Sequence, residues 1–407
     1  MMKKPFALAL VLVMALSLCA CGGNTDGSTK APESTPAQTQ ASSQAQTQAQ
    51  TQAQTEAQST VAPAADVKVA MITDYGDITD QSFNQTTYEA CKEYADANGL
   101  TFKYFKPVTN ADEDRVSMIE AAIDEGFNVI VMPGYAFGPA IVQTTPEYPD
   151  VTFIALDVSQ GDLGDFKLLP NTYCAVYQEE LCGYMAGYAA VKLGYTKLGF
   201  LGGMAVPAVV RYGYGFVQGC DAAAKELGKS DVEVKYCYGG QFYGDADITA
   251  AMDTWYQGGT EVVFACGGGI YTSACEAAQK VNAKVIGVDV DQDGTITSQY
   301  AAGMTVTSAM KGLAATVKTM LQVVVDGKFA DYGGKVDNLG LVSDVPEENY
   351  VQIAPSTQYA EGKFTANDYA QLVKDMHAGK VTVSNAIDVT ADSFATVITV
   401  VDQGNLK

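Results

Sequence analysis

Short apolar runs alternate with longer amphipathic stretches along most of the chain. The apolar runs are rich in Val, Ile and Phe, and most of them end in Gly or Asp. They occupy residues 68–73, 100–106, 128–134, 151–158, 197–203, 232–240, 261–269 and 284–291. Apolar runs of this length, separated by helical patterns, are typical of buried parallel strands with helical crossovers. The pattern therefore predicts an α/β fold built on parallel sheets.

Two of the intervening stretches predict helices with defined ends. The first covers residues 83–98, with Asp80 or Ser82 as a possible N-terminal cap and Gly99 as its terminator. The second covers residues 179–193 and ends at the glycine that follows. Its apolar residues recur at helical spacing, so we expect it to be well buried.

The N-terminal residues follow the pattern of an export signal. Lys3 and Lys4 precede an apolar run that is too short for a comfortable membrane span, so residues 1–20 read as a signal peptide. The sequence LCAC that ends this run resembles a bacterial lipobox with Cys21 as the lipidated residue; Cys19 is a poorer candidate because Leu precedes it. We therefore expect a lipid anchor on the extracytoplasmic face of the cell membrane. The alternative is an ordinary secreted protein.

The stretch that follows, residues 21–65, is dominated by Gln, Ala, Thr and Ser. Such a composition has almost nothing to bury and predicts a disordered tether behind the lipidated cysteine.

Composition narrows the class of partner. The 407 residues are 47% hydrophobic, enough for two ordinary domain cores. The formal net charge is −22, which repels a phosphate backbone, and we expect no nucleic-acid partner.

Motifs for a metal, a nucleotide cofactor or nucleophilic catalysis are missing. No GxGxxG opens a helix, and neither GxxxxGK[ST] nor GxSxG occurs. The single His makes a Ser-His-Asp triad improbable. We therefore predict a binding protein with no cofactor and no metal, rather than an enzyme. Seven cysteines follow the tether, an odd number without CxxC spacing, and we expect them to be buried thiols. They are Cys91, Cys174, Cys182, Cys220, Cys237, Cys266 and Cys275.

Polar and glycine residues follow five of the predicted strands. Because ligands meet the loops at the carboxyl ends of parallel strands, these positions are candidate ligand contacts. They are Asp74, Gly134, Asp157, Gly267 and Asp289. Each acid also fits a helix cap or a solvated loop charge.

Several separated blocks resemble the basic membrane protein (BMP) family of substrate-binding lipoproteins, which includes purine nucleoside receptors of ABC importers. The blocks are DYGDITDQSFNQ, AVYQEELCGYMAGYAAVKLG, KLGFLGGMAVPAVVRYGYGFVQGCDAA, KVIGVDVDQ and TVTSAMKGL. The resemblance covers about residues 67–325 and is weaker after 330. It implies a type I periplasmic-binding-protein fold, in which two Rossmann-like lobes with parallel sheets are joined by three crossings and close over a ligand.

We place these crossings near Asn171, Ser308 and Gly334. The N-terminal lobe is then expected at 66–171 plus 309–334, and the C-terminal lobe at 172–308 plus 335–407.

The resemblance implies that two aromatic rings hold a nucleobase. Phe83 would stack on the base, and Asn84 and Asp74 would contribute hydrogen bonds. Tyr212 stands where the family often places the opposing ring. From its position alone, Phe83 fits equally a hydrophobic staple that packs under its own helix.

The resemblance also implies the polar partners of a nucleoside. Asp289 would accept hydrogen bonds from two ribose hydroxyls, and Lys311 would donate to the ribose and partly neutralise Asp289. Asp157 would read the edge of the base. Arg211 is unusual beside an uncharged ligand: it would either pair with a surface acid or select an anionic ligand.

These features predict a monomeric lipid-anchored receptor that captures a nucleoside, with purine expected, and presents it to an ABC permease and its ATPase. The alternatives are a binding protein for a sugar or other small polar ligand, and a surface interaction or sensor lipoprotein.

Overall fold

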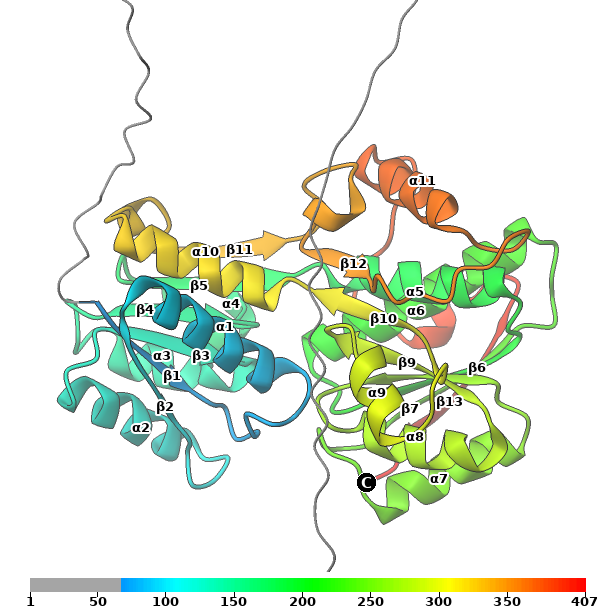
Figure 1. The fold of residues 1–407 in the computed structure, drawn as a ribbon, viewed down its shortest axis with the longest axis horizontal. Coiled ribbons are helices and arrows are strands. Elements are labelled where there is room, and N and C mark those ends of the chain that lie inside the picture. Colours follow the sequence, from blue (N-terminus) through cyan, green and yellow to red (C-terminus); the bar gives the residue numbers. More distant parts are fainter. Residues whose placement is uncertain (1–66) are drawn as a thin grey trace, which may run out of the picture. The chain divides into compact units, whose positions relative to one another are not determined.

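Two β-sheets covered by helices make up the part of the chain that the computed structural model describes, residues 67–407 (Figure 1). The predicted signal peptide, Cys21 and the predicted tether lie outside the described residues.

The first lobe is built on a six-stranded parallel sheet in the order β11-β5-β4-β3-β1-β2. Its strands are β1 (Lys68–Ile72), β2 (Thr101–Phe105), β3 (Val129–Pro133), β4 (Thr152–Leu156), β5 (Thr172–Tyr177) and β11 (Lys335–Leu339). Its helices are α1 (Phe83–Asn98), α2 (Asp112–Asp124), α3 (Gly138–Thr144), α4 (Gln160–Leu163) and α10 (Leu313–Val325). All five residues of β3 are buried, as expected for a central strand covered on both faces.

The second lobe is built on a seven-stranded sheet in the order β12-β10-β9-β8-β6-β7-β13. Its strands are β6 (Lys197–Gly202), β7 (Glu233–Tyr238), β8 (Val262–Cys266), β9 (Lys284–Asp289), β10 (Thr305–Lys311), β12 (Val351–Ile353) and β13 (Thr399–Asn405). Its helices are α5 (Glu179–Leu193), α6 (Pro207–Glu226), α7 (Ala246–Gln257), α8 (Tyr271–Val281), α9 (Asp293–Gln299) and α11 (Ala366–His377). All its pairings are parallel except β10 with β12, which is antiparallel.

The chain passes between the two sheets at three places, as the predicted fold requires. It leaves the first sheet after β5 at Gln178, returns after β10 at Gly312, and leaves again between β11 and β12 (Figure 1). The predicted positions near Asn171, Ser308 and Gly334 were wrong, because each lies directly before a strand or inside one. The sheet changes only after that strand has ended.

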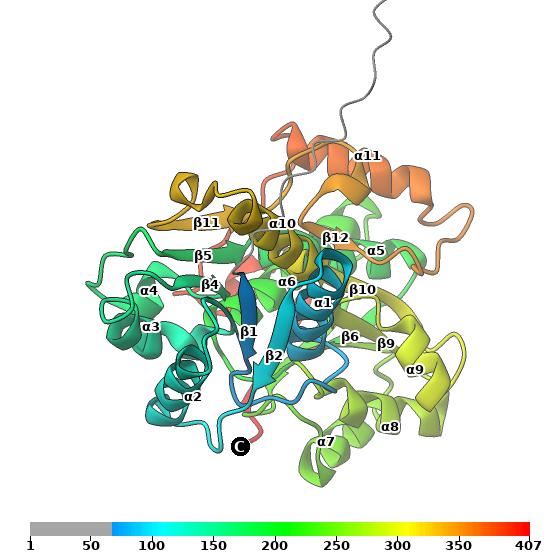
Figure 2. The same ribbon diagram turned by 60° about the vertical axis from the view of Figure 1, so that its left-hand side comes forward.

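The reason for this difference is strand pairing between distant segments. β11 pairs in parallel with β5, and β10 pairs with β9. Figure 2 shows α10 and β11 beside β5 in the first lobe, although they come much later in the sequence. Apolar periodicity marks a strand but does not say which sheet it joins.

All eight strands predicted from apolar runs are present, and both predicted helices have the expected bounds. The prediction from apolar runs did not include β5, β10, β11, β12 or β13. Of these, β11 and β13 are mostly exposed or half-buried, so their sequences carry little apolar signal.

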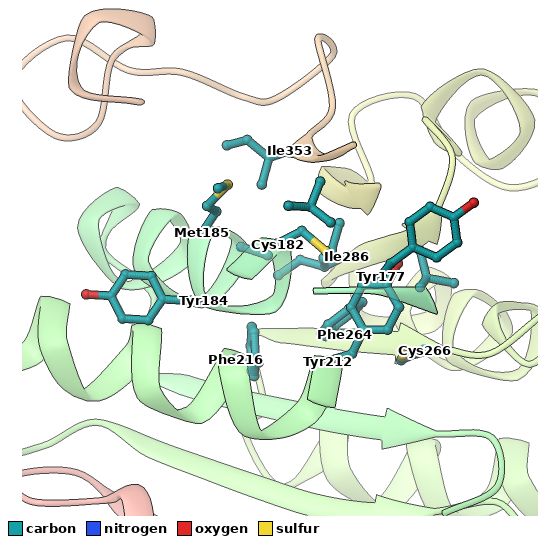
Figure 3. Packing of buried hydrophobic residues seen from close by; sticks show 14 of the residues in the cluster. Tyr177, Cys182, Tyr184, Met185, Tyr212, Phe216, Phe264, Cys266, Ile286 and Ile353 are labelled. Carbon is teal, nitrogen blue, oxygen red and sulfur yellow. The ribbon is translucent and has the colours of Figure 1, made fainter. Parts of the chain in front are cut away.

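Helices α5 and α6 pack closely because each presents two glycines to the other. A Cβ added at Gly183 would lie 2.2 Å from the backbone oxygen of Tyr212, and one at Gly215 would lie 2.1 Å from that of Glu180. Only glycine permits this approach, which brings the start of α5 next to residues 211–216 of α6. Figure 3 shows side chains from both helices, among them Cys182 of α5 and Tyr212 of α6, in one buried cluster.

The seven cysteines in residues 67–407 are buried free thiols, as predicted. Within the same residues, no helix has the length and apolar character needed to cross a membrane.

Candidate functional site

A cavity of about 390 Å³ lies between the two lobes and is lined by residues of both. This volume is within the range of small-molecule sites. All nine residues predicted as ligand contacts line it. They are Asp74, Phe83, Asn84, Gly134, Asp157, Tyr212, Gly267, Asp289 and Lys311.

Each lobe places one aspartate at the carboxyl end of the corresponding strand of its sheet. Asp157 follows β4 and Asp289 ends β9, and these strands occupy the same place in their sheets. Both residues have a positive φ, 59° for Asp157 and 64° for Asp289. Such a backbone conformation is uncommon for a non-glycine residue, and it clusters at functional sites. The carboxyl ends of the two sheets therefore bring one constrained carboxylate each to the cavity.

The loop after β1 holds its polar groups through backbone hydrogen bonds. Asp74 accepts from the N–H groups of Tyr75 and Gly76, each at 2.6 Å, while burial raises the pKa of its carboxyl. A Cβ at Gly134 would lie 3.2 Å from the Asp74 carboxylate, so the lack of a side chain at Gly134 leaves room for this carboxylate.

Asp80, rather than Ser82, supplies the side-chain cap of α1. Its carboxylate accepts from the backbone N–H groups of Ser82, Asn84 and Gln85 at 2.9–3.1 Å. Burial raises the pKa of Asp80 to about 6. The hydroxyl of Ser82 is thereby available to the other lobe, where it donates to Asp289 Oδ2 at 2.5 Å.

Two acceptor atoms on residues that line the cavity are buried without a partner. They are Asn84 Oδ1 and Asp157 Oδ1. Because buried polar atoms in native proteins are nearly always hydrogen-bonded, these two acceptors beside the cavity are candidate partners for ligand donors.

Lys311 is the electrostatic centre of the site. Its Nζ lies 2.5 Å from Asp157 Oδ2, 3.4 Å from Glu179 Oε1 and 3.7 Å from Asp289 Oδ1. Burial by itself would lower the pKa of Lys311, but attraction to Asp157, Asp289 and Glu179 outweighs it and raises that pKa. The lysine therefore stays charged at neutral pH.

The same ammonium lies over aromatic rings. It is 4.8 Å from the ring centre of Phe83, 5.5 Å from that of Tyr177 and 5.6 Å from that of Tyr212. A cation over a ring face is attracted by the ring's quadrupole, so Lys311 also stabilises the positions of these three rings.

Burial raises the pKa of Asp157 to about 6, although the charge of Lys311 pulls it down. Asp157 is thus mainly ionised at neutral pH. It belongs to the first lobe and Lys311 to the second, so their ion pair joins the lobes across the cavity.

Arg211 pairs with a buried acid, Glu179, rather than with a surface acid as was considered from the sequence. Its Nε lies 2.7 Å from Glu179 Oε2, and the Glu179 side chain is fully buried. Glu179 also contacts Lys311, so it links two cations at the start of α5. No local signal in the sequence marks this role of Glu179, because an acid in the first turn of a helix is ordinary.

The charges near the cavity leave no excess cation for an anion. Lys311 and Arg211 face three carboxylates, those of Asp157, Glu179 and Asp289, and Lys106, the third cation in the lining, pairs with Asp77. The selection of an anionic ligand by Arg211, left open by the sequence, is therefore disfavoured.

The two predicted stacking residues are in different settings. Phe83 is half-buried at the start of α1 and lines the cavity. Tyr212 is 2% exposed, packs edge-on against Phe264, and its hydroxyl lies 3.4 Å from Asp289 Oδ1. Figure 3 shows Tyr212 beside Phe264, with Tyr177 and Cys266 nearby. The hydroxyl of Tyr212 therefore orients Asp289, and its stacking role stays a prediction.

Hydrogen bonds connect the lobes over the cavity. The side chain of Gln292 donates to the backbone oxygen of Gln81 at 3.1 Å, and the hydroxyl of Thr295 donates to Gln81 Oε1 at 2.9 Å. Together with the contact between Ser82 and Asp289, these bonds hold the lobes closed. Within residues 67–407, no group of His, Cys, Asp and Glu side chains could hold a metal ion.

Residues 67–366 match the family model described as ABC transporter substrate-binding protein PnrA-like. Over 325 residues the chain is 29% identical to the ABC transporter nucleoside-binding protein BmpA of Lactococcus lactis, covering 74% of this chain and 89% of that protein. It is 27% identical over 283 residues to basic membrane protein B of Borreliella burgdorferi, covering 68% and 78%.

Solved structures show the same fold. A solute-binding protein of an ABC transporter system from Aeropyrum pernix superposes with a TM-score of 0.62 at 19% identity, covering 81% of this chain and 90% of that one. A second, from Conexibacter woesei, has a TM-score of 0.59 at 22% identity, covering 78% and 99%. The predicted type I fold is thereby confirmed.

The relatives are substrate-binding proteins rather than enzymes, which agrees with the prediction from motifs. The family model covers well over half of the chain. The chain belongs to the Bmp family of PnrA-like substrate-binding proteins of ABC transporters.

Proposed function

We propose that the protein captures an uncharged nucleoside, with a purine base preferred, between its lobes and delivers it to an ABC permease. The observation that carries this proposal is the cavity itself, in which Phe83 lies at one wall and the carboxylates of Asp157 and Asp289 lie on either side of Lys311. A nucleoside needs both an aromatic surface for its base and charged partners for its hydroxyls.

The two unpartnered acceptors fit the base. Asn84 Oδ1 and Asp157 Oδ1 would accept from N–H groups on its edge, which would satisfy atoms that are otherwise buried alone. Asp289 would accept from the ribose hydroxyls, while Lys311 would donate to the ribose. The Lactococcus lactis relative is named a nucleoside-binding protein, which supports the same ligand class.

A sugar without a base is the second candidate, because sugars also use aromatic walls and carboxylates. The buried acceptors Asn84 Oδ1 and Asp157 Oδ1 do not distinguish a base N–H from a hydroxyl donor. Direct ligand screening separates the two.

The expected result of a thermal-shift screen of residues 66–407 is stabilisation by nucleosides and not by free pentoses or amino acids. A ligand at 100 times its dissociation constant stabilises the folded state by about 2.7 kcal/mol. For a chain of this size that is a rise in melting temperature of a few degrees. Purine and pyrimidine nucleosides, free bases and pentoses form the panel. A shift with pentoses alone would contradict the proposal.

We also propose that a diacylglyceryl group on Cys21 holds the protein as a monomer on the extracytoplasmic face of the membrane. Several relatives are named lipoproteins, which supports such a location.

Replacing Cys21 by Ser is expected to abolish membrane attachment, because the thiol is the point of acylation. The measurement is detergent phase partitioning of cell extracts, with Cys19→Ser as the matched control that keeps attachment. Equal partitioning of the Cys21→Ser variant and the wild type would show that the anchor lies elsewhere.

A further inference from the structure

The segment Thr399–Lys407, here called the tail, lies beyond the residues that match the family model. Its strand β13 pairs in parallel with β7 from Thr399 opposite Glu233 to Asn405 opposite Tyr238, and so adds an edge strand to the second sheet. The far end of the tail, red in Figure 1, lies beside α7.

The tail ends against one loop, residues 239–245, here called the rim loop. The backbone N–H of Leu406 donates to the oxygen of Tyr238 at 2.8 Å, directly before this loop. Lys407 forms an ion pair with Asp245 and a hydrogen bond of 3.3 Å to Gln241 Oε1. The tail therefore contacts both the beginning and the end of the rim loop.

The acid that Lys407 binds is also the cap of the helix that follows. Asp245 is the N-terminal cap of α7, where its carboxylate accepts from the N–H groups of Asp247 and Ile248 at 3.0 Å each. Lys407 thus binds an acid whose position is already determined by the fold, which makes Asp245 a rigid attachment point.

The rim loop forms part of the cavity wall through Phe242 and Tyr243. The Phe242 ring packs on two glycines of other strand ends: a Cβ at Gly203 would lie 2.3 Å from the ring, and one at Gly267 would lie 2.8 Å from it. The backbone oxygen of Phe242 accepts from the N–H of Gly269 at 2.8 Å. The rim loop is therefore joined to the glycine-rich loop after β8 that carries the predicted ligand contact Gly267.

Tyr243 has no comparable packing. Tyr243 lines the cavity, yet the residue is 61% exposed. A large exposed aromatic ring beside a cavity is available to cover a ligand. Such a ring becomes buried only when the ligand is bound.

We propose that the tail positions the rim loop so that Phe242 and Tyr243 form the outer wall of the ligand cavity. In this arrangement Phe242 and Tyr243 contact the ligand, and Leu406 and Lys407 are positioning residues. The inference rests on the proposed function for the ligand, whereas the contact between tail and rim loop is independent of it.

Lys407→Ala tests the positioning role, with Lys380→Ala as its matched control. Lys380 also forms a surface ion pair, with Asp375 of α11, and neither Lys380 nor Lys407 lines the cavity. The probe is inosine, titrated calorimetrically. We expect Lys407→Ala to weaken inosine binding about two- to fivefold, as suits a partly exposed pair, and Lys380→Ala to leave it unchanged.

Tyr243→Ala is expected to weaken binding about tenfold, because an aromatic cover over the ligand is lost. In the double variant Lys407→Ala/Tyr243→Ala, the effect of Lys407→Ala should shrink, since one of the two residues through which it acts is absent and only Phe242 remains. Full additivity of the two changes would show that Lys407 does not act through Tyr243 and would overturn that part of the proposal. Unchanged inosine affinity in Tyr243→Ala would overturn the ligand contact.

Two further readouts do not need a ligand. In Lys407→Ala, hydrogen exchange should become faster at the backbone N–H groups of Gly239 and Gly240. These groups donate to the backbone oxygens of Gly202 and Gly203 at 2.8 and 2.9 Å. The single Trp of the sequence, Trp255, donates to Gln403 Oε1 of the tail at 2.8 Å, so its fluorescence reports whether the tail is docked.

These readouts separate the two hypotheses. If the wild type binds no nucleoside, the proposed function fails, and the exchange rates still decide whether Lys407 orders the rim loop. Unchanged exchange at Gly239 and Gly240 in Lys407→Ala would overturn the inference whatever the ligand is.

Discussion

Asp289→Asn is expected to weaken nucleoside binding by about a hundredfold to several-thousandfold, equivalent to on the order of 3–5 kcal/mol. Asp289 is 5% exposed and already accepts from Ser82 and Tyr212, so its charge is concentrated in a largely desolvated place. The amide of Asn carries no charge, so in this variant Lys311 loses the Asp289 carboxylate as an ion-pair partner. Asn is the variant of choice because it tolerates the positive φ of 64°, which Ala would resist.

The matched control is Asp291→Asn. Asp291 lies two residues later, is exposed and bonds to Ser356, so its change should leave affinity nearly intact. A titration of the wild type and Asp289→Asn with a ribonucleoside and its 2′-deoxy form completes a double-mutant cycle. We expect the wild type to prefer the ribonucleoside and the variant to lose that preference. Equal preferences in both proteins would show that Asp289 does not bind the 2′-hydroxyl.

Lys311→Met is expected to lower the free energy of unfolding by about 3–5 kcal/mol at pH 7 and to abolish detectable binding. The side chain is 3% exposed, and its removal leaves the carboxylates of Asp157, Glu179 and Asp289 close together without their shared cation. Removing one partner from a buried charge cluster costs more than the cluster contributes, because the remaining charges stay desolvated. The measurement is urea unfolding followed by circular dichroism.

The control for Lys311→Met is Lys318→Met. Lys318 forms an exposed ion pair with Glu93, so this change should alter stability by well under 1 kcal/mol. An equal loss in the two variants would contradict a special role for the buried lysine.

The loss in Lys311→Met should depend on pH. Burial already raises the pKa of Asp157 from 3.8 to about 6 in the folded protein, against the pull of Lys311. Without the lysine this pKa rises further, so the folded state binds a proton more tightly than the unfolded state does. Stability therefore increases as the pH falls from the folded pKa toward 3.8, and this gain begins at a higher pH in the variant. The difference between variant and wild type should shrink between pH 7 and pH 4. A difference that stays constant over this range would show that the carboxylates do not cause the loss.

The strands and the helix ends could be predicted because their signals are local. Each central strand is a continuous apolar run, since both of its faces are covered, and β3 is buried at every residue. The start of α1 follows from its cap, and the ends of α1 and α5 follow from Gly99 and Gly194, both with positive φ. Such signals need no knowledge of the rest of the chain.

The members of the site were also accessible from the sequence, for a topological reason. Asp74, Gly134, Asp157, Gly267 and Asp289 each follow or end a strand, and the carboxyl ends of parallel strands meet at one edge. The family resemblance added Phe83, Asn84, Tyr212 and Lys311, and the structure places all of them around the same cavity.

By itself, then, the sequence determined eight of the strands, the ends of two helices, and which acids reach a common edge. Only the tertiary structure decided which sheet β5, β10 and β11 join, and that Glu179 binds both Arg211 and Lys311. The same holds for the hydroxyl of Ser82, which bonds to Asp289 of the other lobe while Asp80 caps α1. These contacts join residues from 32 to 207 positions apart. They depend on how the sheets and helices pack, and periodicity and capping signals extend over only a few residues of one element.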